Sequence, residues 1–66
     1  MNLVVNGASH THQGGGTVAE LLAEYRLAPA MTALMINGQV FRRSQWNSIE
    51  LVEGDAVELI VAAAGG

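Results

Sequence analysis

The alternation of residues along the chain predicts strands near both ends. Residues 2–6 and residues 56–61 place every second side chain on one face, which is the spacing of a strand. The first segment alternates around Leu3 and Val5, and in the last segment Val57, Leu59 and Val61 share one face. Glu58 and Ile60 share the opposite face of the last strand, so this outer face is part acidic and part apolar.

Two Asn-Gly pairs predict tight hairpin turns. Asn6 and Gly7 precede a polar segment, residues 8–13, and Asn37 and Gly38 divide the apolar sequence TALMINGQVF. Asn and Gly tolerate the positive φ angles that a two-residue hairpin turn requires. We therefore expect an N-terminal hairpin with a solvated edge strand and a second hairpin after residue 31.

The sequence between the hairpins predicts one short amphipathic helix. Thr17 is followed three residues later by Glu20, the spacing at which each side chain accepts a free backbone N–H at a helix start. Pro29 prevents the helix from continuing. Between them, apolar residues recur at i, i+3, i+4 and i+7, forming one stripe: Val18, Leu21, Leu22 and Tyr25.

The resulting order, ββαβββ, favours an α+β fold in which the helix covers one face of a mixed sheet. The leading candidate is the β-grasp fold of ubiquitin-like proteins, with the first and last strands parallel in the centre of the sheet. Residues 1–64 are expected to form this single domain. Gly65 and Gly66 are expected to form a flexible tail that leaves the sheet edge.

The composition argues against several classes of function. The 66 residues include no cysteine, which removes disulfides and thiolate chemistry and suits a reducing compartment. With three arginines, no lysine and a net charge of -3, the chain lacks the basic field that holds nucleic acid. No signal peptide and no apolar run of about 20 residues is recognisable, so we expect a cytoplasmic protein without a membrane partner.

Six segments that together span nearly the whole chain form an ordered pattern: NLVVNG, TVAELLAEYRLAP, ALMINGQV, RRSQW, LVEGDAVELI and the terminal GG. With these segments in this order, the chain resembles the ThiS family, the sulfur carrier proteins of thiazole biosynthesis. Each segment is weak evidence by itself, and their shared order and spacing make the resemblance specific.

The resemblance implies that the carboxylate of Gly66 is the reacting group. In this family an E1-like adenylating enzyme of the ThiF type uses ATP to adenylate that carboxylate, and a sulfur donor converts it to a thiocarboxylate. A thiazole synthase of the ThiG type then accepts the sulfur for thiamine formation. Because glycines lack a Cβ atom, Gly65 and Gly66 can pass through a narrow channel in the partner.

The chain itself is not expected to be an enzyme or to bind a cofactor. The sequence contains no recognisable pairing of nucleophile and base. The three glycines at 14–16 lead into Thr17 without the lysine of a phosphate-binding loop. ATP and the sulfur donor would therefore be used by the partner enzyme, and the chain would be a protein co-substrate.

The outer face of the sheet is the predicted partner-binding surface. If Leu34 faces the helix, alternation turns Met35 outward, where it joins Val4, Ile60 and Glu58. An exposed apolar patch of this kind commonly marks a site of protein contact. We expect both the adenylating enzyme and the synthase to dock there.

Other candidate residues favour structural roles. His10 and His12 share a face of the second strand, but no third metal ligand is evident, so we predict no metal site. The Arg42-Arg43 pair is interpreted as a solvated loop rather than a partner contact. Trp46 is expected to anchor this loop in the core.

Two alternative functions share the same fold and terminal glycines. One is the small subunit of molybdopterin synthase, which uses the same thiocarboxylate chemistry. The other is a ubiquitin-like modifier that becomes attached to lysines of other proteins. The RSQW segment followed by LVEGDAVEL favours thiazole biosynthesis, and the absence of lysine excludes chains built through the protein's own side chains.

Overall fold

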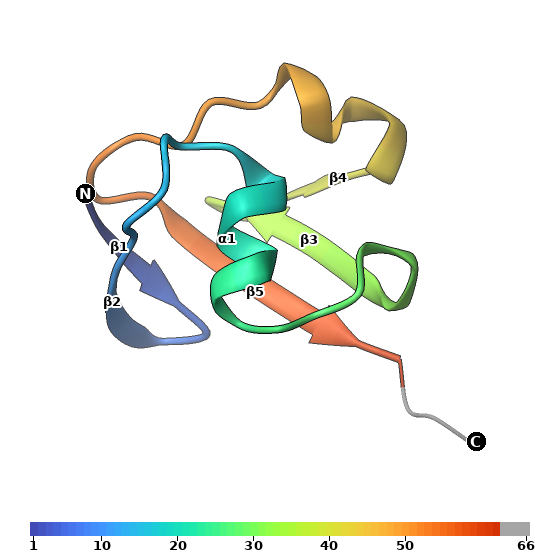
Figure 1. Ribbon diagram of the computed structural model, residues 1–66, viewed down its shortest axis with the longest axis horizontal. Coiled ribbons are helices and arrows are strands. Elements are labelled where there is room, and N and C mark those ends of the chain that lie inside the picture. The colour runs from blue at the N-terminus through green and yellow to red at the C-terminus, as the bar shows by residue number, and fades with distance from the viewer. Residues whose placement is uncertain (63–66) are drawn as a thin grey trace.

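The computed structural model describes residues 1–62 and contains a five-stranded sheet with α1 packed across one face (Figure 1). The strands are β1 Asn2–Val5, β2 Ala8–Thr11, β3 Thr32–Ile36, β4 Gln39–Phe41 and β5 Ala56–Val61. The helix α1 spans Val18–Glu24, and two 3-10 helices, η1 and η2, span Pro29–Met31 and Arg43–Ser48. Within the described part of the chain, no helix has the length and apolar character needed to cross a membrane.

The strand order β2-β1-β5-β3-β4 places the first and last strands side by side in the centre of the sheet. β1 and β5 run parallel, whereas the pairs β1–β2, β3–β4 and β3–β5 are antiparallel. A helix that connects the N-terminal hairpin to the other strands covers the face they share (Figure 1). The predicted α+β class, the ββαβββ order and the β-grasp sheet are therefore confirmed.

Both hairpin turns form at the predicted Asn-Gly pairs. Asn6 and Asn37 have φ angles of 51° and 50°, and the glycines that follow have φ angles of 81° and 83°. The asparagine amides also bind β5: Asn6 Oδ1 accepts from the Leu59 N–H at 2.8 Å, and Asn37 Oδ1 accepts from the Ala56 N–H at 2.9 Å. These residues therefore shape the turns and connect them to the central strand.

The helix begins as predicted and ends earlier than Pro29 requires. Thr17 and Glu20 form the full capping box, with the Glu20 N–H donating to Thr17 Oγ1 at 3.1 Å. Arg26 takes a φ of 54°, and the Leu27 N–H then donates to the Leu22 carbonyl at 3.0 Å. This left-handed residue and the returning hydrogen bond close the helix, as in a common C-terminal cap.

The core lies between α1 and the sheet, and η2 covers one end of it. The buried apolar residues are Leu3, Val5, Val18, Leu21, Leu22, Leu34, Ile36, Trp46, Leu51, Val57 and Leu59. Trp46 is buried from η2 and donates its indole N–H to the Phe41 carbonyl at 3.1 Å. Its structural role is confirmed, and the segment predicted as a loop is a 3-10 helix around this anchor.

Candidate functional site

The end of β5 is held in place by η1. The backbone N–H of Ala62 donates to the Met31 carbonyl at 2.8 Å, one residue beyond the last strand. Gly65 and Gly66, the predicted tail and reacting residue, lie outside the described residues, as does the predicted domain boundary at 64. The structure therefore fixes the direction in which the chain leaves the sheet as far as Ala62.

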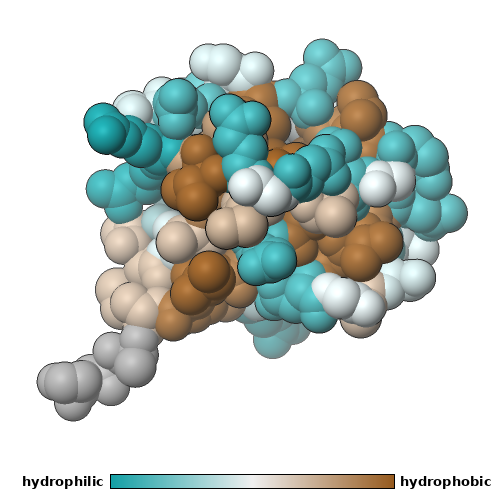
Figure 2. Space-filling view, turned by 180° about the vertical axis from the view of Figure 1, so that it is seen from behind, coloured by the Kyte–Doolittle hydropathy of each residue, from teal (hydrophilic) through white to brown (hydrophobic). Residues whose placement is uncertain are grey.

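The predicted outer-face patch, Val4, Met35, Glu58 and Ile60, lies on the sheet face opposite α1. The intervening residues of β1, β3 and β5 are buried beneath the helix, so strand alternation turns these four side chains outward. Val4 and Ile60 are 39% and 55% exposed, Glu58 is exposed and Met35 is half-buried. Figure 2 shows this uncovered side of the sheet, where apolar residues gather near the end of β5 and hydrophilic residues interrupt them.

The strand register divides this patch into two parts. Met35 pairs with Glu58 and Ala33 pairs with Ile60, whereas Val4 pairs with Ala56 at the start of β5. Ile60 is four positions beyond Ala56 along the strand, a distance of about 13 Å. Glu58 therefore lies between two apolar ends of the patch, and the structure brings Met35 and Ile60 closer to each other than either is to Val4.

The outer face also includes Val40, which the sequence analysis did not identify. Val40 pairs with Met35 across the β3–β4 hairpin and is 65% exposed. A two-residue turn at Asn37 and Gly38 pairs residues 36 with 39 and 35 with 40, so the register could have been read from the turn. The apolar surface therefore continues from β3 to the edge strand β4.

His10 and His12 meet a third polar side chain, Glu24 of α1. Glu24 Oε1 lies 2.7 Å from His10 Nε2 and 2.8 Å from His12 Nδ1. Glu24 Oε2 accepts from the backbone N–H groups of Gln13 and Gly14 at 2.7 and 3.1 Å. β2 ends two residues earlier than predicted because the Gln13 N–H donates to this carboxylate.

The donors of this cluster favour hydrogen bonds over a metal ion. Its three candidate ligand atoms lie within 4.8 Å of one another, so the spacing alone would permit a small cation. However, buried His12 accepts at Nε2 from the Gly16 N–H at 3.1 Å, which places the ring proton of the neutral imidazole on Nδ1. Metal binding at Nδ1 would move that proton to Nε2, where it would oppose the Gly16 N–H.

The charge of Glu24 contributes to stability. Burial raises the pKa of Glu24, but hydrogen bonds from His10, His12 and Gln13 lower it by more. The resulting pKa is about 2. Because the folded-state pKa is below the ordinary value of 4.5, the stabilisation is complete above about pH 4.5. It is lost as the pH falls from there towards 2.

We expect Glu24→Gln to lower the free energy of unfolding by about 1–3 kcal/mol at pH 7, since two backbone donors and two imidazoles lose a charged acceptor. Thermal unfolding followed by circular dichroism between pH 2 and pH 7 measures this loss. The wild-type midpoint should fall more steeply than that of the variant below pH 4.5. Exposed Glu50→Gln is the control, and parallel pH profiles for Glu24→Gln and wild type would contradict this role.

The three arginines are exposed and lie outside the cluster: Arg26, Arg42 and Arg43. Among residues 1–62, the salt bridges within 4.0 Å join Glu24 to the two histidines, and none involves an arginine. Arg42 and Arg43 lie where the chain enters η2, in agreement with a solvated position. Their guanidinium groups therefore remain available to solvent in the described structure.

Comparison with known proteins identifies relatives that match the full length of this chain. The family model of the ThiS family matches residues 3–66. The sulfur carrier protein ThiS of Escherichia coli (strain K12) is 35% identical over 66 residues, covering 100% of both chains.

Two solved structures of a thiamine biosynthesis protein (ThiS) from Geobacter metallireducens share 36% sequence identity with the chain. The crystal structure has a TM-score of 0.79 and covers 100% of both chains. The solution structure has a TM-score of 0.80 and covers 100% of this chain and 88% of that one. By its sequence and its fold, the chain belongs to the ThiS family.

Proposed function

We propose that this protein is a sulfur carrier whose Gly66 carboxylate becomes a thiocarboxylate and donates sulfur to the thiazole ring of thiamine. The observation that carries the proposal is the match to a sulfur carrier protein over 100% of both chains. The relatives named as thiamine biosynthesis proteins support this reading over a molybdopterin synthase subunit or a protein modifier. The protein acts as a co-substrate, and the catalytic groups belong to its partners.

The proposed chemistry activates a carboxylate that is otherwise a poor acyl electrophile. A Gly66 carboxylate oxygen attacks the α-phosphorus of ATP in an adenylating enzyme of the ThiF type, and pyrophosphate leaves. A sulfide-level nucleophile then attacks the acyl carbon, and AMP leaves with the oxygen that it acquired. The thiocarboxylate that remains transfers its sulfur to a substrate bound by a thiazole synthase of the ThiG type.

The fold supports this function by aiming the tail from a fixed strand. β5 is paired on both sides, with β1 and with β3, and Ala62 is hydrogen-bonded to Met31. Gly66 is the fourth residue after Ala62, which gives an extended reach of at most about 14 Å. Gly65 and Gly66 add no side chains to this reach, which suits entry into a narrow nucleotide site.

Intact-mass measurement tests sulfur carriage directly. The protein is incubated with ATP, the adenylating enzyme and a sulfur donor, with matched samples that lack each component. Replacement of one oxygen by sulfur in the complete mixture supports the proposal, and an unchanged mass with an active enzyme would refute it. Supplying the product to a thiazole synthase and to a molybdopterin synthase large subunit, with their substrates, then distinguishes the two pathways.

The outer-face patch is proposed to dock the partner enzymes. We expect Ile60→Asp to raise the KM for adenylation about tenfold, a loss of about 1.4 kcal/mol, because it places a second carboxylate beside Glu58 on an apolar contact. Steady-state pyrophosphate release measures KM, and thermal unfolding verifies that exposed residue 60 tolerates the change. Val52→Asp, at another exposed apolar residue, is the control, and equal KM values for both variants would remove Ile60 from the docking surface.

A further inference from the structure

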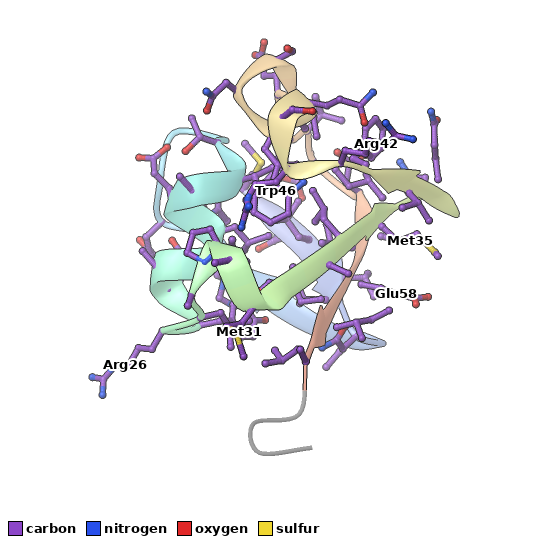
Figure 3. All side chains as sticks on the ribbon, turned by 90° about the vertical axis from the view of Figure 1, so that its right-hand side faces the viewer. Arg26, Met31, Met35, Arg42, Trp46 and Glu58 are labelled. Carbon is purple, nitrogen blue, oxygen red and sulfur yellow. The ribbon has the colours of Figure 1, made fainter. Side chains whose placement is uncertain are left out.

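An open apolar hollow lies beside the end of β5, between this strand and η1. It has a volume of about 310 Å³ and is lined by Ala30, Met31, Thr32, Ala33, Ile60 and Ala62. We name these six residues the tail groove. Figure 3 shows Met31 at the end of the molecule where the described chain finishes.

The tail groove is apolar because its polar groups have partners within the fold. The Thr32 hydroxyl donates to the Ala28 carbonyl at 2.8 Å, and the Met31 carbonyl accepts from the Ala62 N–H. The remaining lining is supplied by alanine, methionine and isoleucine side chains. A methionine thioether adapts its shape readily, so Met31 is suited to contact an inserted apolar group.

We propose that the tail groove receives an apolar side chain of the adenylating enzyme, presented beside the entrance to its nucleotide site. This inference rests on the proposed function. Since Gly66 lies at most about 14 Å beyond Ala62, an enzyme that reacts with Gly66 must bring its entrance close to Ala62. Ala62 is itself a wall of the groove, and Ile60 belongs to both the groove and the outer-face patch.

One positively charged residue, Arg26, lies near the tail groove and is suited to the edge of the proposed contact. Arg26 is exposed at the same end of the molecule as Met31, whereas Arg42 lies at the opposite end (Figure 3). Arg26 has a φ of 54° at a helix-end position where glycine is the usual residue. A cation in this unfavourable conformation fits a partner surface whose apolar anchor is bordered by carboxylates.

A matched pair of charge substitutions tests occupancy of the groove. Met31→Glu and Val52→Glu each add one negative charge at an exposed apolar residue, but Val52 lies in the segment before β5, away from the groove. We expect Met31→Glu to raise the KM for pyrophosphate release at least about tenfold, with kcat unchanged at saturation because Gly66 is intact. Val52→Glu should keep KM within about twofold of wild type.

Equal KM values for Met31→Glu and Val52→Glu would overturn the proposal that the enzyme occupies the tail groove, but would not contradict sulfur carriage. That result is distinct from a failure of the proposed function, in which wild-type protein is not adenylated at any concentration. Thermal unfolding of both variants verifies that each is folded at the assay temperature. The Met31→Glu variant should still form the thiocarboxylate at saturating concentration, which would show that its C-terminal carboxylate can react.

Arg26→Gly provides a second test in which stability and recognition change in opposite directions. Glycine relieves the positive φ, so we expect the unfolding midpoint to rise by about 2–6 °C. We expect KM to rise at least about threefold, because the partner's carboxylates lose their cation. An unchanged KM would remove Arg26 from the contact, and a rise in KM with a higher midpoint cannot be attributed to unfolding.

Discussion

Deletion of Gly66 is expected to reduce thiocarboxylate formation at least about 100-fold, below detection in an intact-mass assay. The deletion moves the terminal carboxylate back by one residue, about 3.5 Å, and misplacement of a reacting group by even 1 Å can cost about 100-fold in rate. The shortened chain still ends in a glycine carboxylate, that of Gly65. The lower rate would therefore report the position of the carboxylate and not its chemical identity. Single-turnover formation of the thiocarboxylate is the measurement.

The matched control for this deletion is Val52→Glu, which alters an exposed residue in the described fold and keeps the tail complete. It should be converted as fast as wild type. The unfolding midpoint of the deletion variant should equal that of wild type, because the buried core comprises residues between Leu3 and Leu59. Conversion of the shortened chain at the wild-type rate would place the reaction somewhere other than Gly66.

Leu21→Ala is expected to have the largest effect on the fold. Leu21 of α1 is fully buried against the sheet. Truncation of such a side chain lowers the free energy of unfolding by about 2–5 kcal/mol. A domain of this size has a total stability of about 3–10 kcal/mol. The variant should therefore lose a large part of its stability and unfold at a much lower urea concentration, as measured by circular dichroism.

Val40→Ala is the control for this core substitution, because Val40 is an exposed apolar residue of β4. Its free energy of unfolding should remain within about 0.5 kcal/mol of wild type. A Leu21→Ala variant as stable as Val40→Ala would contradict the packing of α1 against the sheet. Sulfur transfer by Leu21→Ala should decline only as the folded fraction declines.

Local signals explain why most of the fold could be predicted from the sequence. The Asn-Gly turns and the capping box depend on residues within four positions of each other, and all three features were confirmed. The parallel pairing of β1 with β5 followed from one helix joining two sets of strands in a short chain. The stripe that ends at Tyr25 predicted the length of α1, but an arginine at residue 26 gives no sequence signal of a left-handed φ, as a glycine would.

Contacts between distant residues explain what the sequence did not reveal. Glu24 reaches His10 and His12 only because α1 packs beside β2, and helical periodicity does not state which strand a polar side chain will meet. The six residues of η2 carry no apolar repeat, so only Trp46 indicated that the segment is tied to the core. The tail groove likewise arises where η1 meets β5, far apart in sequence.

The candidate site was likewise predicted only in part from the sequence. The alternation of β3 and β5 placed Met35, Glu58 and Ile60 correctly on the outer face, but only the register separated Val4 from Ile60. The partners of this face remain a prediction. Gly65 and Gly66 were singled out by sequence and lie outside the described residues, so their role is a proposal, which the resemblance and the match to a sulfur carrier protein support.

The most direct test of the account is to locate the transferred sulfur within the protein. After incubation with ATP, the adenylating enzyme and a sulfur donor, cleavage after Glu58 releases the C-terminal peptide LIVAAAGG. Tandem mass spectrometry of this peptide should place one sulfur, in exchange for one oxygen, on Gly66. Sulfur found on any other residue, or a peptide of unchanged mass from sulfurated protein, would contradict the assignment of Gly66 as the carrier site.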